Sequence, residues 1–315
     1  AVPITRVGLY IPGGNSPLFS TVLMLAIPAR LAGCRKIVLC TPPGKDGKVH
    51  PAIFYAASIS GVTEIYKVGG AQAIAAMAFG TESVPRVSKI FGPGNRFVME
   101  AKQQVSLGAA AIDMPAGPSE VMIIADGAAD ARFVASDFLS QAEHGPDSQS
   151  ILLTTDAAFA AKLPVVIEEL LATLPRQEMM HKSLAHSRVI LLHNDDEVMA
   201  FANEYAPEHL IINRTDAEAI AARVENAGSV FIGGYSPESA GDYASGTNHT
   251  LPTSGYAKAY SGVNIDSFTK KITFQHLTPE GLASIGPAIE ILAENEDLMA
   301  HRLAVTVRLE SLKNN

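Results

Sequence analysis

Four of the nine histidines stand near residues that could share a proton or a metal ion with them: His144, His209, His249 and His301. Glu208 and His209 are adjacent, at the start of a segment that is predicted to be a buried strand. A carboxylate and an imidazole on a short loop can transfer protons at neutral pH. The alternative is a solvated glutamate beside a core histidine, and the dipeptide alone does not decide between the two.

A second set of candidates closes the helix that is predicted to begin near Ala128. Apolar residues recur there at intervals of three and four, and Gly145 and Pro146 end the pattern. Gln141 and His144 stand three apart in the last turn, so their side chains leave the same side of the helix. A carboxamide oxygen and an imidazole nitrogen could share one metal ion there. Alternatively, both are surface residues and the helix dipole favours His144 at that end.

The segment 233–259 is rich in glycine, serine, tyrosine and proline and has no helical or strand period. A loop of this length in a compact protein is usually functional or disordered. Its polar composition, with few charged residues, favours a functional loop. Asp242 within it could be a hard oxygen ligand or a turn residue, and His249 follows seven residues later.

Glycine-rich turns follow three predicted strands, at Gly13-Gly14, Gly69-Gly70 and Gly92-Pro93-Gly94. Each could let a phosphate approach backbone N–H groups at the start of a helix. The third turn has Phe97 where the last glycine of the G-x-G-x-x-G pattern would fall, so it does not complete that motif. A dinucleotide site is therefore one interpretation, in an atypical form.

Strand-like and helical segments alternate along most of the chain. This pattern predicts an α/β fold with mostly parallel sheets and with ligands at the carboxyl ends of the strands. The segment from Val121 to Ala125 is expected to close the first set of strands, and a second set follows the central helix. After a strand-like Ile272–Phe274, two helical stretches are expected, from Pro279 to Leu292 and from Glu296 to about Leu312.

The chain has 315 residues, of which 47% are hydrophobic and 18% are charged, with a net charge of −8. This is a globular composition without a basic block, so nucleic acid and membranes are poor partner hypotheses. No signal-peptide pattern or membrane-length apolar run is apparent. Cys34 and Cys40 fit no metal-ligand spacing and are expected to be reduced, as in a cytoplasmic protein.

Several separate motifs, in a consistent order, resemble those of histidinol dehydrogenases. They are Val68-Gly69-Gly70-Ala71-Gln72-Ala73, Phe91-Gly92-Pro93-Gly94-Asn95, Ile112 to Glu120, Ser140 to Gly145, Ala206-Pro207-Glu208-His209-Leu210 and Gly246-Thr247-Asn248-His249. The resemblance covers essentially the whole chain. It implies a four-electron, NAD-linked oxidation of L-histidinol to L-histidine through the aldehyde, the last step of histidine biosynthesis.

The resemblance also implies roles for particular residues. Glu208 and His209 would be the catalytic acid–base pair, and one zinc ion per subunit would be bound by Gln141, His144, Asp242 and His301. Tyr10, Gln72 and Asn95 would contribute to the NAD site. The substrate would be bound by Ser119, His249 and Glu296 together with the zinc ligands and His209.

By the same resemblance, two incomplete Rossmann-like domains are expected, followed by a C-terminal helical arm. Residues 10–125 would form the domain that contributes the NAD-site residues. Residues 1–9 and 126–263 would form the second, which carries most zinc and catalytic residues, and residues 264–315 the arm. Family members are homodimers, in which Glu296 and His301 would reach the partner's active site.

One departure from the family is apparent, because its members usually carry a long segment before the strand at Val7, which would form part of the second domain. This motivates an alternative hypothesis, an inactive fragment that binds zinc or nucleotide without turnover. Another alternative is a dehydrogenase of a different small polar alcohol. Substrate panels and NADH formation distinguish the three hypotheses.

Overall fold

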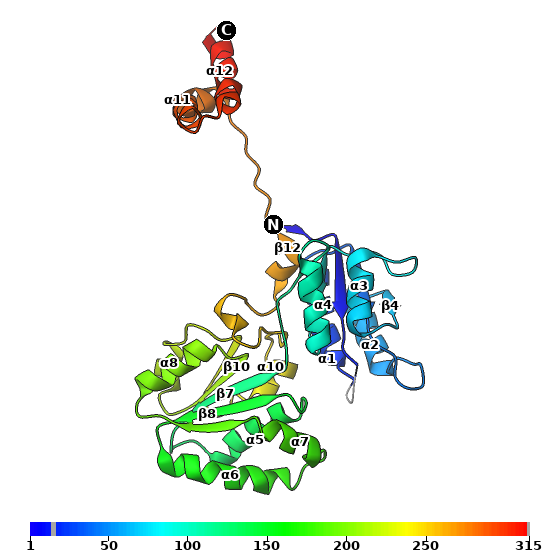
Figure 1. The fold of residues 1–315 in the computed structure, drawn as a ribbon, viewed down its shortest axis with the longest axis vertical. Coiled ribbons are helices and arrows are strands. Elements are labelled where there is room, and N and C mark those ends of the chain that lie inside the picture. Colours follow the sequence, from blue (N-terminus) through cyan, green and yellow to red (C-terminus); the bar gives the residue numbers. More distant parts are fainter. Residues whose placement is uncertain (14–16, 314–315) are drawn as a thin grey trace. The chain divides into compact units, whose positions relative to one another are not determined.

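The computed structural model describes residues 1–13 and 17–313 (Figure 1). Residues 14–16, which include Gly14 of the first predicted glycine turn, lie outside the described part. The chain divides into two compact units, residues 1–270 and the residues from Lys271 onward. Each unit is described by itself.

The first sheet of unit 1 has five parallel strands in the order β4-β3-β2-β5-β6. Helices connect most of them, as a parallel sheet requires. The elements are β2 (Arg6–Tyr10), α1 (Phe19–Leu31), β3 (Lys36–Cys40), α2 (Pro51–Ile59), β4 (Glu64–Tyr66), α3 (Gly70–Phe79), β5 (Lys89–Phe91), α4 (Arg96–Ser106) and β6 (Ala111–Ile112).

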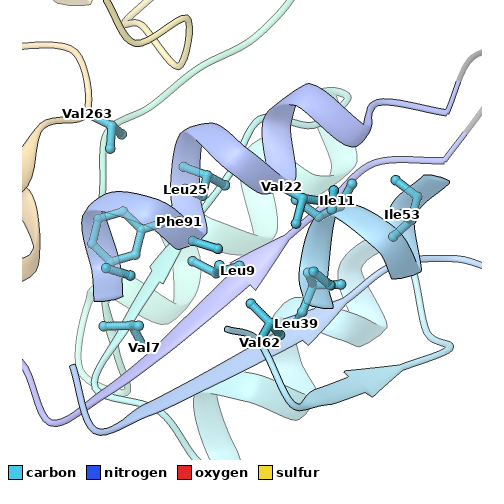
Figure 2. Close-up of a cluster of buried hydrophobic side chains, with 14 of the residues drawn as sticks. Val7, Leu9, Ile11, Val22, Leu25, Leu39, Ile53, Val62, Phe91 and Val263 are labelled. Atoms are coloured by element: carbon cyan, nitrogen blue, oxygen red, sulfur yellow. The ribbon is translucent and has the colours of Figure 1, made fainter. Parts of the chain in front are cut away.

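Both faces of this sheet are covered, so its central strands are apolar on both sides. Leu9 of β2 packs into a cluster with residues of α1 and α2, while Tyr10 of the same strand packs with residues of α3 and α4 on the other face. Figure 2 shows Leu9 and Phe91 beneath Leu25 of α1. Phe91 also stacks on Phe268, with ring centroids 4.0 Å apart, which ties a distant segment to the sheet.

The second sheet of unit 1 has five parallel strands in the order β11-β10-β7-β8-β9. Helices α5 to α7 cover one face and α8 and α9 the other. The elements are β7 (Glu120–Ala125), α5 (Ala131–Ala142), β8 (Gln149–Thr154), α6 (Ala157–Leu171), α7 (Gln177–Leu184), β9 (Arg188–Leu191), α8 (Asp195–Tyr205), β10 (His209–Asn213), α9 (Ala217–Ala221) and β11 (Ser229–Ile232).

The strand assignment between the two sheets differs from the sequence prediction. The segment from Val121 to Ala125, expected to close the first set, belongs to β7 (Glu120–Ala125) at the centre of the second sheet. Residues 1–9 are predicted to belong to the second domain, whereas Arg6–Tyr10 forms β2 at the centre of the first sheet. The predicted α/β class with parallel sheets is confirmed. The boundaries of the domains stay a prediction.

The segment after β11 is more ordered than predicted. It contains the helix α10 (Glu238–Tyr243) and the 3-10 helices η1 (Tyr256–Lys258) and η2 (Ile265–Phe268). The short strand β12 (Thr269–Lys270) pairs antiparallel with β1 (Val2–Pro3), so both ends of unit 1 meet. The strand expected at Ile272–Phe274 is absent, because these residues follow β12 in an extended segment without a paired neighbour among the described residues.

Unit 2 is a helical hairpin of α11 (Pro279–Asn295) and α12 (Met299–Lys313), close to the two predicted helices. Thr278 caps α11 by accepting a hydrogen bond from the Gly281 N–H at 3.0 Å. Within the described residues, no helix has both the length and the apolar composition to span a membrane.

Candidate active site

A cavity of about 850 Å³ lies in unit 1, between loops of the two sheets. The first sheet contributes loops that follow its strands, including Asn95 after β5. The second sheet contributes residues that precede its strands, such as Ser119 before β7 and Glu208 before β10. Seven predicted site residues line this cavity: Asn95, Ser119, His144, Glu208, His209, Asp242 and His249.

The position of the cavity corrects one expectation. Ligands were expected at the carboxyl ends of the strands, and this holds for the first sheet. In the second sheet, the lining residues lie at the amino ends, because Glu208 and His209 come at the start of β10 rather than after it. The strands of this sheet are parallel, so the starts of β7, β8 and β10 meet at this same edge.

The carboxylate of Glu208 is held by the backbone of the neighbouring strand. The Glu120 N–H donates to Glu208 Oε2 at 3.0 Å. The side chain of Glu120 is itself fixed, since its two oxygens accept from the Tyr205 hydroxyl at 3.0 Å and the Ser254 N–H at 2.9 Å. This network connects β7, α8 and the loop after α10, and it fixes Glu208 at the cavity wall.

Both members of the predicted acid–base pair are buried, with Glu208 5% and His209 4% exposed. Burial raises the pKa of Glu208 well above its usual value. Burial, followed by the proximity of His144, lowers the pKa of His209 to about 3. The imidazole is therefore neutral at physiological pH and able to accept a proton, and the carboxyl group is closer to neutrality than a surface glutamate.

Three side chains form a group whose nitrogen and oxygen atoms suit a metal ion. The ligand atoms of His144, Glu238 and Asp242 all lie within 4.8 Å of one another. His144 follows α5, whereas Glu238 and Asp242 lie on α10, which packs against α5. Two of these residues, His144 and Asp242, were predicted ligands.

The third predicted ligand of unit 1, Gln141, is fully buried in α5. Its amide nitrogen and oxygen have no hydrogen-bond partner among the described residues, and neither do the two carboxylate oxygens of Glu238. Buried polar groups are almost always paired in folded proteins. An imidazole with carboxylate and carboxamide oxygens is a donor set that zinc accepts, so the residues fit a zinc ion.

Glu238 is a candidate metal-ligating residue that the sequence interpretation missed. It lay in the segment 233–259, which was predicted to be a loop without helical period. The structure forms a helix there, so Glu238 and Asp242, four residues apart, stand one above the other. The four-residue spacing of two carboxylates was the available signal.

His249 and Ser119 lie on the cavity wall, as expected for substrate-binding residues. His249 is held at both ring nitrogens: Nε2 lies 3.2 Å from Thr21 Oγ1, and Nδ1 lies 3.2 Å from the Asp242 carbonyl oxygen. This double contact orients the ring and connects α1 to α10.

The three residues expected at the NAD site lie around glycine turns of the first sheet. The Gly70 N–H donates to the Tyr10 hydroxyl at 3.1 Å, and Gln72 lies in the first turn of α3 beside it. Asn95 caps α4 by accepting from the N–H groups of Phe97 and Val98, both at 3.1 Å. Of the three, Asn95 is the one that lines the cavity.

The remaining predicted site residues, Glu296 and His301, belong to unit 2. Glu296 caps the end of α11 and His301 lies in the first turns of α12. Both side chains are exposed. Their membership of the site is a prediction that unit 1 alone leaves untested.

Comparison with known proteins identifies the family of the chain. The sequence profile of histidinol dehydrogenase matches residues 1–309. Histidinol dehydrogenase of Bacteroides fragilis (strain YCH46) is 62% identical over 99% of this chain and 73% of the relative. That of Bacteroides thetaiotaomicron is 63% identical, again over 99% of this chain and 73% of the relative.

A solved structure gives the same result for the fold. The crystal structure of histidinol dehydrogenase from Elizabethkingia anophelis superposes with a TM-score of 0.96 at 57% identity, covering 99% of this chain and 72% of that one. At this identity and coverage, the fold is shared over nearly the whole chain. The chain therefore belongs to the histidinol dehydrogenase family.

Proposed function

We propose that the cavity of unit 1 oxidises L-histidinol to L-histidine in two NAD-linked steps, with zinc bound by Gln141, His144, Asp242 and His301. Family membership makes the chain an oxidoreductase of histidine biosynthesis. The observation that supports the site is the convergence of a buried Glu208–His209 pair and two candidate metal ligands, His144 and Asp242, on one cavity. The reaction is expected to take place in the cytoplasm, in a homodimer.

His209 supplies the base for the first oxidation. A hydride can leave the carbinol carbon only as the hydroxyl proton is removed, and the neutral imidazole of His209 can take that proton. The lowered pKa of His209, which results mainly from its burial, keeps the ring unprotonated for this step. Bound zinc would hold the imidazole and amine of the substrate, and NAD would accept the hydride.

Glu208 supplies the base for the second oxidation. The aldehyde must gain a water molecule before a second hydride can leave, and the water loses a proton as it adds to the carbonyl carbon. Glu208 lies next to His209 at the cavity wall, and burial raises the pKa of its carboxyl group, which makes its carboxylate a stronger base than that of a surface glutamate. Ser119 and His249, on the same wall, would hold the polar groups of the substrate.

The purified chain is expected to form two NADH per L-histidinol, because oxidation of an alcohol to an acid removes four electrons. Chelation should abolish turnover and added zinc should restore it. Absorbance at the NADH band, with product identified by mass spectrometry, measures both. Folded, zinc-loaded protein that forms no NADH would favour the inactive-fragment hypothesis, and turnover of other polar alcohols instead would favour a different substrate.

The NAD site is tested by replacing Asn95 with Asp. Aspartate caps helices as well as asparagine does, so the free energy of unfolding should change by less than about 0.5 kcal/mol. The added negative charge would face the cofactor phosphates and should raise the KM for NAD roughly tenfold. Chemical denaturation and NAD titration measure the two effects.

A matched control for this substitution is available in the second sheet. Asn194 caps α8 by accepting from the Glu197 N–H at 2.9 Å, and it does not line the cavity. Asn194→Asp should therefore leave the KM for NAD unchanged. An unchanged KM in Asn95→Asp as well would remove Asn95 from the NAD site and leave it as a helix cap.

A further inference from the structure

We propose that Glu238 is a positioning residue for His209: its carboxylate accepts a hydrogen bond from His209 Nδ1–H, so that Nε2 is the basic nitrogen. This inference rests on the proposed function, in which His209 is the base. It adds a residue and a tautomer to that site. The role concerns Glu238 and His209 themselves and does not require Glu238 to touch the substrate.

The first support is a pair of buried atoms that lack partners. Glu238 is 1% exposed, and neither of its carboxylate oxygens has a hydrogen-bond partner among the described residues. His209 Nδ1 is buried and has no hydrogen-bond partner among the described residues either, although the Glu120 backbone lies close enough to the ring to raise its pKa against the larger effect of burial. Glu238 Oε1 lies 3.6 Å from this nitrogen. The distance exceeds that of a hydrogen bond, and catalytic hydrogen bonds often tighten only when the substrate binds.

Glu238 is a better acceptor for this nitrogen than Glu208. Glu208 Oε2 also lies 3.6 Å from His209 Nδ1, but it already accepts the Glu120 N–H at 3.0 Å. The oxygens of Glu238 accept no hydrogen bond from the described residues. Pairing Glu238 with His209 therefore satisfies two buried groups at once, whereas pairing Glu208 would leave Glu238 unsatisfied.

The surroundings restrict the His209 ring to few orientations. Phe231 packs against it with ring centroids 6.0 Å apart and a tilt of 42°. A Cβ at Gly241 of α10 would come within 2.7 Å of the Phe231 ring, so α10 lies directly against this phenylalanine. The helix that carries Glu238 therefore packs on the residue that supports His209, and Glu238 reaches the ring from a fixed backbone.

An acceptor on Nδ1 has a direct chemical consequence. It places the ring proton on Nδ1 and leaves the lone pair on Nε2, the nitrogen that must then take the proton of the substrate hydroxyl. An aspartate orients the base of serine proteases in this way, and its replacement by an amide produces the wrong tautomer. Glu238→Gln offers His209 an amide N–H donor and should produce the same fault.

A second hypothesis assigns Glu238 to the metal. Its Oε1 also lies 3.7 Å from His144 Nε2, and it groups with His144 and Asp242. The two hypotheses make opposite predictions for Glu238→Gln. A positioning residue leaves zinc content unchanged and alters the His209 tautomer, whereas a ligand lowers the zinc content and leaves the tautomer unaltered.

The deciding experiment is a two-bond proton–nitrogen correlation spectrum of the full chain labelled with 15N-histidine. The signal that disappears in His209→Gln assigns the ring. We expect Nδ1 protonated and Nε2 unprotonated in the wild type, and a shift toward the opposite tautomer in Glu238→Gln. In parallel, kcat for L-histidinol should fall about 10²- to 10⁴-fold with an unchanged KM and unchanged zinc per chain.

Glu204→Gln is the matched control, because this glutamate is 86% exposed and pairs with Lys258 at the surface. It should change neither tautomer nor rate. A wild-type ring protonated at Nε2, a tautomer insensitive to Glu238→Gln, or loss of zinc in that variant would each overturn the inference. The wild-type spectrum tests it even if the variant does not fold. A wild type that fails to oxidise L-histidinol would refute the proposed function separately.

Discussion

An equal mixture of His209→Gln and His301→Asn chains, each inactive alone, is expected to regain about a quarter of wild-type turnover after subunit exchange. His209 lies in unit 1, at the cavity, whereas His301 lies in unit 2. The proposal takes His301 from the partner chain. Loss of the base should reduce kcat by roughly 10²- to 10⁴-fold, and loss of His301 should remove a zinc ligand.

The expected fraction follows from the geometry of a shared site. Half of the dimers are mixed, and each mixed dimer has one site with both substitutions and one with neither. If each site used His301 of its own chain, every site would contain one substitution and no activity would return. The mixing experiment therefore distinguishes a site shared between subunits from a site within one chain.

A matched control combines His209→Gln with Glu208→Gln. Both residues come from unit 1 of one chain, so each site in a mixed dimer keeps one substitution and turnover should stay at the level of the variants alone. Native mass spectrometry of isotopically labelled chains verifies the exchange. Full exchange without recovery in the His301→Asn mixture would contradict the shared site.

The candidate residues of the site were easier to identify from the sequence than their placement in the fold. Glu208-His209 and Gln141 with His144 are local patterns, and short segments with strong periods carry that information along the chain. The edge of the second sheet at which they meet was predicted wrongly. The sequence does indicate the correct end of the strand, since Glu208 and His209 precede the apolar run of β10 rather than follow it.

The sheet assignment of Glu120–Ala125 depends on β6 (Ala111–Ile112), a two-residue strand that the sequence analysis does not predict. Parallel neighbours in one sheet need a crossover of a dozen or more residues, usually a helix. Only residues 113–119 separate β6 from β7, and they form no helix. That segment is too short to return to the same sheet, so β7 had to begin another one. The alternation of strands and helices gives their order but not their sheet.

Other features had no local signal. The pairing of Val2–Pro3 with Thr269–Lys270 involves two residues on each side and joins segments far apart in sequence. The burial of Lys102 and Asp113 likewise has no local signal in the sequence. Each would be interpreted as an ordinary surface charge, and only the fold brings the two together beneath the third glycine turn. The burial of these residues depends on tertiary contacts, and such contacts leave no hydrophobic periodicity in the sequence.

Replacing Lys102 with Met is expected to destabilise the fold by about 3–5 kcal/mol, because it leaves a buried carboxylate without its partner. Lys102 Nζ lies 2.5 Å from Asp113 Oδ1, and the two side chains are 3% and 1% exposed. The substitution preserves the aliphatic length of the side chain and removes the charge. Urea denaturation measures the loss of unfolding free energy.

The same pair should matter for the cofactor, since it holds both polar groups of Gly92. Lys102 donates to the Gly92 carbonyl at 2.8 Å, and the Gly92 N–H donates to Asp113 Oδ2 at 2.8 Å. Gly92 has a φ of 124° and a Cβ there would come 2.1 Å from the Tyr10 carbonyl oxygen, so the turn tolerates only glycine. Lys102→Met should therefore raise the KM for NAD as well.

The control is Lys36→Met, on the same sheet. Lys36 pairs with Glu64 at 3.0 Å, but these side chains are 35% and 37% exposed, and such a pair contributes only about 0–1 kcal/mol. Asp113→Asn added to Lys102→Met should recover part of the loss, because it removes the stranded charge and keeps an acceptor for the Gly92 N–H. If Lys102→Met lowers the free energy of unfolding by no more than Lys36→Met does, the buried pair does not support the glycine turn.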